Sequence, residues 1–272
     1  MKSLVSKVRN KLYLLKRFLY QKTKRKISSK KLVFIMGCQR SGTSMLMDVF
    51  YRDINLMTYK EHEAIFYDSG KKSLRLKDVH DVEFLLEKDN VAVVVAKPLL
   101  DSQRVNELLD QYENSQCIWI YRNYKDVALS NLKQFGEGNG HKDMAYVLNI
   151  DREDWRGEKT SAETLAAVKN YYDENSSNID AAAMFWYVRN KIFFDNNLQN
   201  NRQVKLCRYE DLVSRPEDIV SGLYDFIAEG DFDVNIVSDV HARSVSKGSS
   251  VSLSPAVNKL CEDLLLRFDE NH

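Results

Sequence analysis

The sequence predicts an α/β domain in which helices cover both faces of a central parallel β-sheet. Short runs rich in β-branched and aromatic residues alternate along the chain with longer segments of helical periodicity. One junction between such a run and the next helical segment carries the two glycines of a phosphate-binding loop. Together these observations favour a P-loop-like domain of three layers.

Four short apolar runs are the predicted strands. They are LVFIMG at 32–37, VAVVVA at 91–96, CIWIY at 117–121 and VKLCRY at 204–209. The first three contain no charged residue, and we expect all four to be strands buried on both faces of a parallel sheet.

Helical periodicity fills most of the chain between and after these runs. The expected helices span 43–52, 103–114, 126–135, 182–198, 216–229 and 255–268. Pro216 and Pro255 stand in the first turns of the last two, where proline is well tolerated. The segment 136–180 is polar and contains four of the ten glycines, so we expect loops around a helix at 161–173. We also expect this segment to be the most mobile cover of the domain.

Composition excludes several classes of protein. The chain has 272 residues, of which 44% are hydrophobic and 29% charged, unlike a disordered or low-complexity protein. No apolar run approaches the roughly 18 residues that a transmembrane helix needs. The four cysteines show no CxxC or Cys/His spacing, so we expect no disulfide framework, no metal site and a reducing, cytoplasmic setting.

The charge distribution divides the chain into a basic N-terminal arm, residues 1–31, and a domain, residues 32–272. The arm holds 12 Lys and Arg and no acidic residue, which leaves 28 basic against 39 acidic residues in the domain, about −11. Apolar residues recur in the arm at helical spacing: Leu4, Val8, Leu12, Leu15 and Leu19. A cationic amphipathic helix of this kind suits an anionic membrane surface. The alternatives are a basic helix packed on its own acidic domain, or a frayed terminus.

The phosphate-loop pattern spans Gly37 to Ser44 and follows the first predicted strand directly. Gly37 and Gly42 let the backbone curl so that its N–H groups and the next helix N-terminus face an anion. Thr43 stands where nucleoside-triphosphate loops have lysine, while Arg40 supplies a cation from another position. The pattern therefore predicts a phosphate ester other than ATP–Mg²⁺ as ligand.

A second anion-binding pair is predicted after the strand at 117–121. Arg122 leaves the end of this strand, and Ser130 lies eight residues later in the next helix. A guanidinium and a hydroxyl that converge in this way can hold a second phosphate. Because ligands bind at the carboxyl ends of parallel strands, we expect both anion sites at one edge of the sheet.

These two segments resemble the sulfotransferases that use 3′-phosphoadenosine 5′-phosphosulfate (PAPS), and the carbohydrate-type members in particular. The residues Gln39–Ser44 match the family's loop, and Arg122–Ser130 match its second motif apart from Tyr124, where the family usually has proline. The segment Tyr209–Leu212 is similar to the family's YEDL segment, which we interpret as structural. The resemblance implies the sulfotransferase fold. It also implies that Arg40, Ser41, Gly42, Thr43 and Ser44 bind the 5′-phosphosulfate and that Arg122 and Ser130 bind the 3′-phosphate.

The resemblance also points to candidates for the chemistry. Sulfuryl transfer needs a base for the acceptor proton, cations for the leaving phosphate and in-line positioning. A family glutamate base about 20 residues beyond the loop corresponds to Glu61 or Glu63, with His62 as a third candidate. Lys97, which follows the strand at 91–96, and Arg40 are the catalytic cations. In the basic loop near the C-terminus, Arg243 and Lys247 are further candidates for the 3′-phosphate.

The function that follows is sulfuryl transfer from PAPS to a hydroxyl or amine of a carbohydrate or glycolipid acceptor. Aromatic residues that could stack on sugars are Tyr146, Trp155, Tyr171, Tyr172 and Trp186. The alternatives are a P-loop kinase of a nucleotide or small molecule, which the missing loop lysine disfavours, and a non-catalytic membrane-associated nucleotide binder. We expect no nucleic-acid partner.

Overall fold

A five-stranded parallel sheet forms the centre of the molecule in the computed structural model. The structure describes residues 15–17, 19–20, 23, 27, 29–70, 72–149, 154–227, 232–242 and 244–272. The strand order is β2-β3-β1-β4-β5. The strands are β1 (Lys31–Gly37), β2 (Leu56–Tyr59), β3 (Val93–Ala96), β4 (Ser115–Tyr121) and β5 (Val204–Arg208). The predicted fold class is confirmed.

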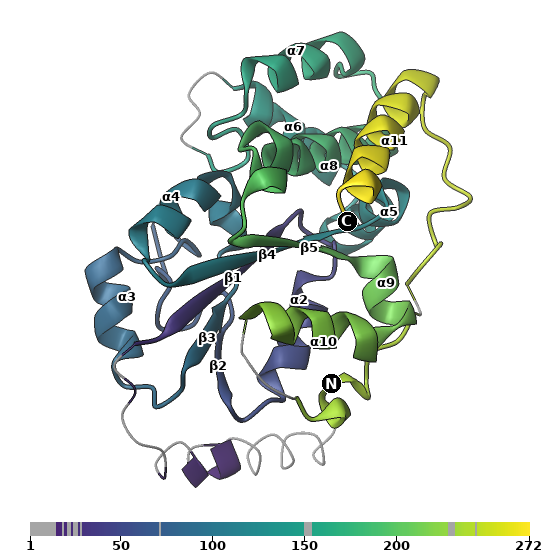
Figure 1. Cartoon of the computed structure of the whole chain (residues 1–272). Coiled ribbons are helices and arrows are strands. Elements are labelled where there is room, and N and C mark those ends of the chain that lie inside the picture. Colours follow the sequence, from purple (N-terminus) through teal and green to yellow (C-terminus); the bar gives the residue numbers. More distant parts are fainter. Residues whose placement is uncertain are drawn as a thin grey trace.

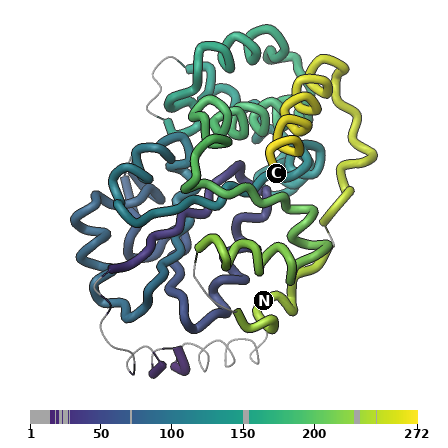
Figure 2. Tube along the Cα trace, viewed as in Figure 1, coloured from purple at the N-terminus to yellow at the C-terminus, as the bar shows by residue number. Residues whose placement is uncertain are grey.

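Helices cover both faces of this sheet (Figure 1). One face carries α2 (Thr43–Tyr51), α9 (Tyr209–Ser214) and α10 (Pro216–Ile227). The other carries α3 (Val79–Leu86), α4 (Val105–Gln111), α5 (Tyr124–Phe135), α6 (Asn139–Leu148), α7 (Ala162–Tyr171), α8 (Asn178–Asp195) and α11 (Pro255–Glu270). Short 3-10 helices are η1 (Leu99–Arg104), η2 (Leu198–Asn200) and η3 (Val234–Val237). Beyond residue 243 the chain runs past the edge of the sheet to reach α11 on the opposite face (Figure 2).

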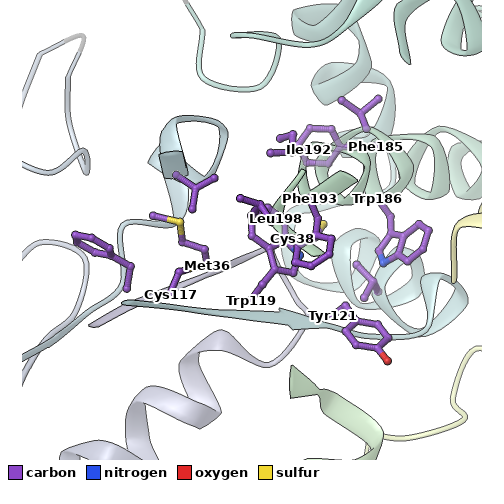
Figure 3. Close-up of a cluster of buried hydrophobic side chains, with 14 of the residues drawn as sticks. Met36, Cys38, Cys117, Trp119, Tyr121, Phe185, Trp186, Ile192, Phe193 and Leu198 are labelled. Atoms are coloured by element: carbon purple, nitrogen blue, oxygen red, sulfur yellow. The ribbon is translucent and has the colours of Figure 1, made fainter. Parts of the chain in front are cut away.

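The core is split by the sheet into two apolar layers, because successive side chains of a strand point to opposite faces. Val33, Ile35 and Ile120 pack toward α2 and α10. Met36, Cys117, Trp119 and Tyr121 point to the other face, where the Trp119 ring packs on Phe193 of α8 at 5.7 Å between ring centres (Figure 3). Four of the five residues of β5 are only half-buried because β5 is an edge strand, so the expectation of a strand buried on both faces was wrong for 204–208.

Strand β1 is the topological switch point of the sheet. From β1 the chain passes to β2 and β3 on one side of β1, and β4 then pairs with β1 on the other side. Phe34 of β1 therefore lies between Ala96 of β3 and Cys117 of β4. Ligand sites of open α/β sheets form outside the carboxyl ends of the strands at this point. The loop after β1 lies at this position.

Some elements differ from the sequence expectation. Strand β2 and helix α3 were not predicted, and α6 lies in the polar segment expected to consist of loops. Helix α6 buries Met144 and Val147 against α8, and Gly140 lets the two backbones approach, since a Cβ there would lie 2.5 Å from the Ala182 nitrogen. The expectation of loops was therefore wrong for 139–148, which packs closely.

The described part of the N-terminal arm lies against the start of β2. The Arg17 guanidinium is buried, donates to the Leu56 carbonyl and lies 5.5 Å from the centre of the Tyr51 ring. The Tyr20 hydroxyl donates to Asn55 Oδ1 at 2.6 Å. Leu15 and Leu19 are each 54% exposed, so the contact with the domain is polar and the leucines face outward. The part of the expected arm helix before residue 15 lies outside the described residues.

Candidate active site

The loop between β1 and α2 has a backbone that requires glycine at two places. Gly37 has φ 136° and Gly42 has φ 101°, both in the region that side chains rarely adopt. A Cβ on Gly37 would lie 2.2 Å from the Ile120 carbonyl oxygen, and one on Gly42 would lie 2.3 Å from the Tyr209 ring. The loop therefore curls tightly against β4 and α9.

The interior of this loop has the features of an anion-binding site. Helix α2 begins at Thr43, directly after the curl, and directs the positive end of its dipole into the loop. The Ser41 hydroxyl is fully buried and has no hydrogen-bond partner among the described residues. Cys38 is buried as well, and desolvation raises the pKa of its thiol to about 12, which excludes it as a nucleophile at neutral pH. A buried hydroxyl without a partner fits an oxygen of a bound phosphate or sulfate.

The predicted second pair lies at the mouth of the same loop. Arg122 follows β4 and donates through Nη1 to the Arg40 carbonyl at 3.2 Å. The Arg40 side chain in turn donates through Nε to Ser130 Oγ at 3.1 Å. The loop, Arg122 and Ser130 are thus joined by direct hydrogen bonds, as expected from the order of the parallel strands.

Arg122 is held firmly but keeps one donor unused. Its side chain is buried, with the guanidinium 4.3 Å from the centre of the Tyr209 ring. The Trp186 indole donates to the Arg122 carbonyl at 3.0 Å, which fixes the backbone of this residue. Arg122 Nε is buried and has no hydrogen-bond partner in the described part of the chain. Burial and the positive charge of Arg122 lower the pKa of Arg40, because both disfavour its charged form.

A charged pair lies at the adjacent strand ends. Lys97 follows β3, and its Nζ lies 2.6 Å from Glu61 Oε2 and 3.1 Å from Ser44 Oγ at the start of α2. The side chain of Lys97 is 7% exposed and that of Glu61 21%. Glu61 is thus connected through Lys97 to the phosphate loop.

The two other base candidates are Glu63 and His62. Glu63 is exposed and accepts from the Lys60 backbone N–H at 2.6 Å, which closes a turn. His62 is exposed and has φ 73°. Neither has a recorded contact with the phosphate loop, whereas Glu61 reaches it through Lys97.

The remaining candidates are the basic residues near the C-terminus and the aromatic rings. Lys247 is exposed in the loop after residue 243, and Arg243 lies outside the described residues. Trp186 is fully buried in the core, so its predicted contact with sugars is wrong. Tyr146 and Tyr171 are exposed, while Trp155 and Tyr172 are half-buried. Within the described ranges no three His, Cys, Asp or Glu side chains are placed to hold a metal ion.

Sequence reasoning missed a contact between Tyr209 and Ser244. Their hydroxyl oxygens lie 2.5 Å apart, and the Ser244 carbonyl accepts from Arg122. Tyr209 was interpreted as structural, although its position at the end of β5 could have indicated a place near the site. Nothing in the sequence links Ser244 to it, because 35 residues separate them.

A model of the sulfotransferase domain family matches residues 30–246 of this sequence. The chain belongs to the sulfotransferase family. It is therefore a sulfotransferase enzyme, and its parallel sheet and phosphate loop are those of a family that uses PAPS as sulfuryl donor. No curated protein matches the sequence.

Solved structures with a similar fold are distant in sequence. The sulfotransferase domain of the Synechococcus olefin synthase is 15% identical with a TM-score of 0.56, over 90% of this chain and 98% of that one. A sulfotransferase from Alicyclobacillus acidocaldarius is 17% identical with a TM-score of 0.45, over 90% and 93% of the two chains. Mouse sulfotransferase SULT7A1, complexed with PAP, is 16% identical with a TM-score of 0.47, over 90% and 88%.

Proposed function

We propose that this sulfotransferase takes its sulfuryl group from PAPS and transfers it to a hydroxyl or amine, with Glu61 as the base. The observation that supports the donor is the chain of hydrogen bonds from Ser130 through Arg40 to Arg122. These hydrogen bonds join the phosphate loop to the anion-binding pair Arg122 and Ser130. A ligand with two separate phosphate groups fits such a site better than a single anion does.

The residues present fit this donor. Ser41 Oγ and Arg122 Nε are buried donors without partners in the described structure, one in the loop and one beside it. We assign Ser41, Gly42, Thr43 and the start of α2 to the 5′-phosphosulfate, and Arg122 and Ser130 to the 3′-phosphate. PAPS, when bound, would supply an activated sulfuryl group, which passes to the acceptor oxygen or nitrogen as 3′,5′-ADP leaves.

Glu61 is the proposed base because it is the candidate in contact with the site. Its carboxylate accepts the proton of the acceptor hydroxyl or amine, and Lys97 holds that carboxylate beside the loop at 2.6 Å. Lys97 also donates to Ser44, so its positive charge lies at the start of α2. There, with Arg40, it stabilises the negative charge that develops on the leaving phosphate.

We propose a carbohydrate or glycolipid as acceptor. A glutamate base is the arrangement of the carbohydrate-type members that the sequence resembles. The exposed ring of Tyr171 supports contacts with sugar faces, whereas the Arg156 guanidinium already lies 4.6 Å from the centre of the Tyr146 ring. An amine acceptor would use the same base.

We also propose that residues 1–31 form an arm separate from the catalytic domain and bind an anionic membrane surface. The family match begins at residue 30, which supports this division. The exposed Leu15 and Leu19 support a peripheral contact, because an arm that only covered its own domain would turn them inward. No helix in the described part of the chain is long and apolar enough to span a bilayer.

Calorimetric titration with 3′,5′-ADP tests the donor assignment. We expect binding without Mg²⁺, and transfer of ³⁵S-labelled sulfate from PAPS to at least one member of a glycan and glycolipid panel. A protein that bound ATP only with Mg²⁺ and ignored 3′,5′-ADP would instead be a kinase. Binding of 3′,5′-ADP without transfer to any acceptor would indicate a non-catalytic nucleotide binder.

Sedimentation with vesicles containing phosphatidylserine tests the arm. We expect the protein to bind these vesicles and the Leu15→Ser/Leu19→Ser variant to lose most of that binding. Leu266→Ser is the matched control, since Leu266 is 53% exposed but lies on α11. Equal binding by all three proteins, or no binding to anionic vesicles, would contradict the proposal.

A further inference from the structure

The loop of residues 244–249, here called the C-terminal loop, is fastened to the start of α5 by one carboxylate. Asp126 is 3% exposed and uses both of its oxygens. Oδ2 accepts from the Ser246 N–H at 2.9 Å, and Oδ1 accepts from the Gly248 N–H at 2.6 Å. Charge-assisted hydrogen bonds of this length are the strong ones.

Close packing completes this attachment. Gly248 is buried, and a Cβ at this position would lie 2.5 Å from the Lys125 carbonyl carbon and 2.7 Å from the Asp126 nitrogen. The backbone of the loop therefore rests directly on the backbone of α5. A larger residue would have to push the loop away from Asp126.

The same carboxylate also contacts the proposed 3′-phosphate site. Arg122 Nη2 lies 3.3 Å from Asp126 Oδ2 and donates to the Ser244 carbonyl, at the other end of the C-terminal loop. Arg122 Nη1 donates to the Arg40 carbonyl. These acceptors fix the guanidinium so that Nε is the nitrogen left without a protein partner in the described structure.

We infer that Asp126 is a positioning residue that couples the C-terminal loop to the cofactor site. It holds the loop and orients the Arg122 guanidinium at once, so a displaced loop also releases Arg122. The inference rests on the proposed binding of PAPS. It goes beyond the family match, which ends at residue 246 and does not include Gly248.

The direct test is the Asp126→Asn variant, studied by calorimetry with 3′,5′-ADP and by kinetics with PAPS. An amide keeps one acceptor oxygen and turns an NH₂ toward the second loop N–H, so one of the two loop bonds is lost. We expect the affinity for 3′,5′-ADP to fall by about 10- to 100-fold and KM for PAPS to rise in parallel. Because Asp126 does not touch the reacting groups, kcat at saturating PAPS stays within about threefold.

Hydrogen exchange gives a readout independent of the cofactor. The Ser246 and Gly248 amides should exchange slowly in the native protein and quickly in Asp126→Asn, while amides of β1 and β4 keep their rates. Gly248→Ala displaces the loop from the other side and should weaken 3′,5′-ADP binding similarly. The Asp126→Asn/Gly248→Ala double variant should bind 3′,5′-ADP no more weakly than the weaker-binding single variant, since both substitutions break the same attachment.

Asp180→Asn is the matched control. Asp180 is a similarly buried carboxylate on α8 that accepts from the Ser254 N–H at 2.9 Å, a few residues beyond the loop. We expect this variant to bind 3′,5′-ADP like the native protein, even if its melting temperature falls.

The outcomes separate the two proposals. Absence of 3′,5′-ADP binding by the native protein would overturn the proposed function. Native binding that Asp126→Asn retains in full, or unprotected Ser246 and Gly248 amides in the native protein, would overturn the role of Asp126.

Discussion

Replacement of Glu61 by glutamine is the sharpest perturbation of the proposed chemistry. Glutamine has the same shape but cannot accept the acceptor proton. Its amide oxygen can still accept from Lys97, which now lies 2.6 Å from Glu61 Oε2. The substitution therefore removes the base and leaves the side-chain packing in place.

The substitution should have a large effect on kcat and a small effect on the free energy of unfolding. General-base catalysis contributes about 10²- to 10⁴-fold, so kcat should fall by that factor, equivalent to roughly 2.7–5.4 kcal/mol of barrier. Lys97 keeps a hydrogen-bond acceptor, so the free energy of unfolding should change by less than about 2 kcal/mol. The affinity for 3′,5′-ADP should remain near the native value, since Glu61 is not assigned to the nucleotide.

The assay is single-turnover transfer of ³⁵S-labelled sulfate from PAPS to the acceptor found in the panel. Glu63→Gln is the matched control, because Glu63 bonds the Lys60 N–H and has no recorded contact with Lys97. We expect its kcat to stay within about threefold of the native value. The assignment is refuted if Glu61→Gln keeps full turnover, or if Glu63→Gln loses activity to the same extent.

Three further predictions follow from single side chains. Ser41→Ala removes a buried hydroxyl that has no partner among the described residues, so the melting temperature should not fall while the affinity for 3′,5′-ADP drops by about tenfold; an unchanged affinity would count against the phosphate loop as the binding site. Gly42→Ala forces a Cβ to within 2.3 Å of the Tyr209 ring at φ 101°, and urea denaturation should show a loss of at least about 1 kcal/mol. Burial raises the pKa of Asp101, so the folded state binds this proton more tightly than the unfolded state; its contribution to stability is complete below the unfolded pKa and declines as pH rises through the folded pKa. Urea denaturation between about pH 4 and pH 7 should therefore show Asp101→Asn gaining stability relative to the native protein as pH rises, and a constant difference would contradict this sign.

Elements with strong local signals were predicted from the sequence. The run LVFIMG, followed by Gly37 and Gly42, identifies β1 and the phosphate loop, because buried strands and tight curls depend on a few adjacent residues. Strand β2 is four residues long and contains Thr58, so its pattern is too short to stand out. Helix α6 is polar along most of its length and is recognisable only through the surface of α8 that it covers.

The missed strand explains why the base could not be chosen from the sequence. Glu61 stands two residues after the end of β2, where the Tyr59 carbonyl accepts from the Lys97 N–H and aligns the two strand ends. Without β2, nothing distinguishes Glu61 from Glu63. The attachment of Gly248 to Asp126 was equally hidden, because it joins residues 122 positions apart in the chain.

A crystal structure with bound 3′,5′-ADP tests the central claim most directly. The account predicts one phosphate within the curl of residues 37–44 against Ser41 Oγ, and the other against Arg122 Nε and Ser130 Oγ. A nucleotide bound at another edge of the sheet, or one whose second phosphate turned away from Arg122 into solvent, would contradict it.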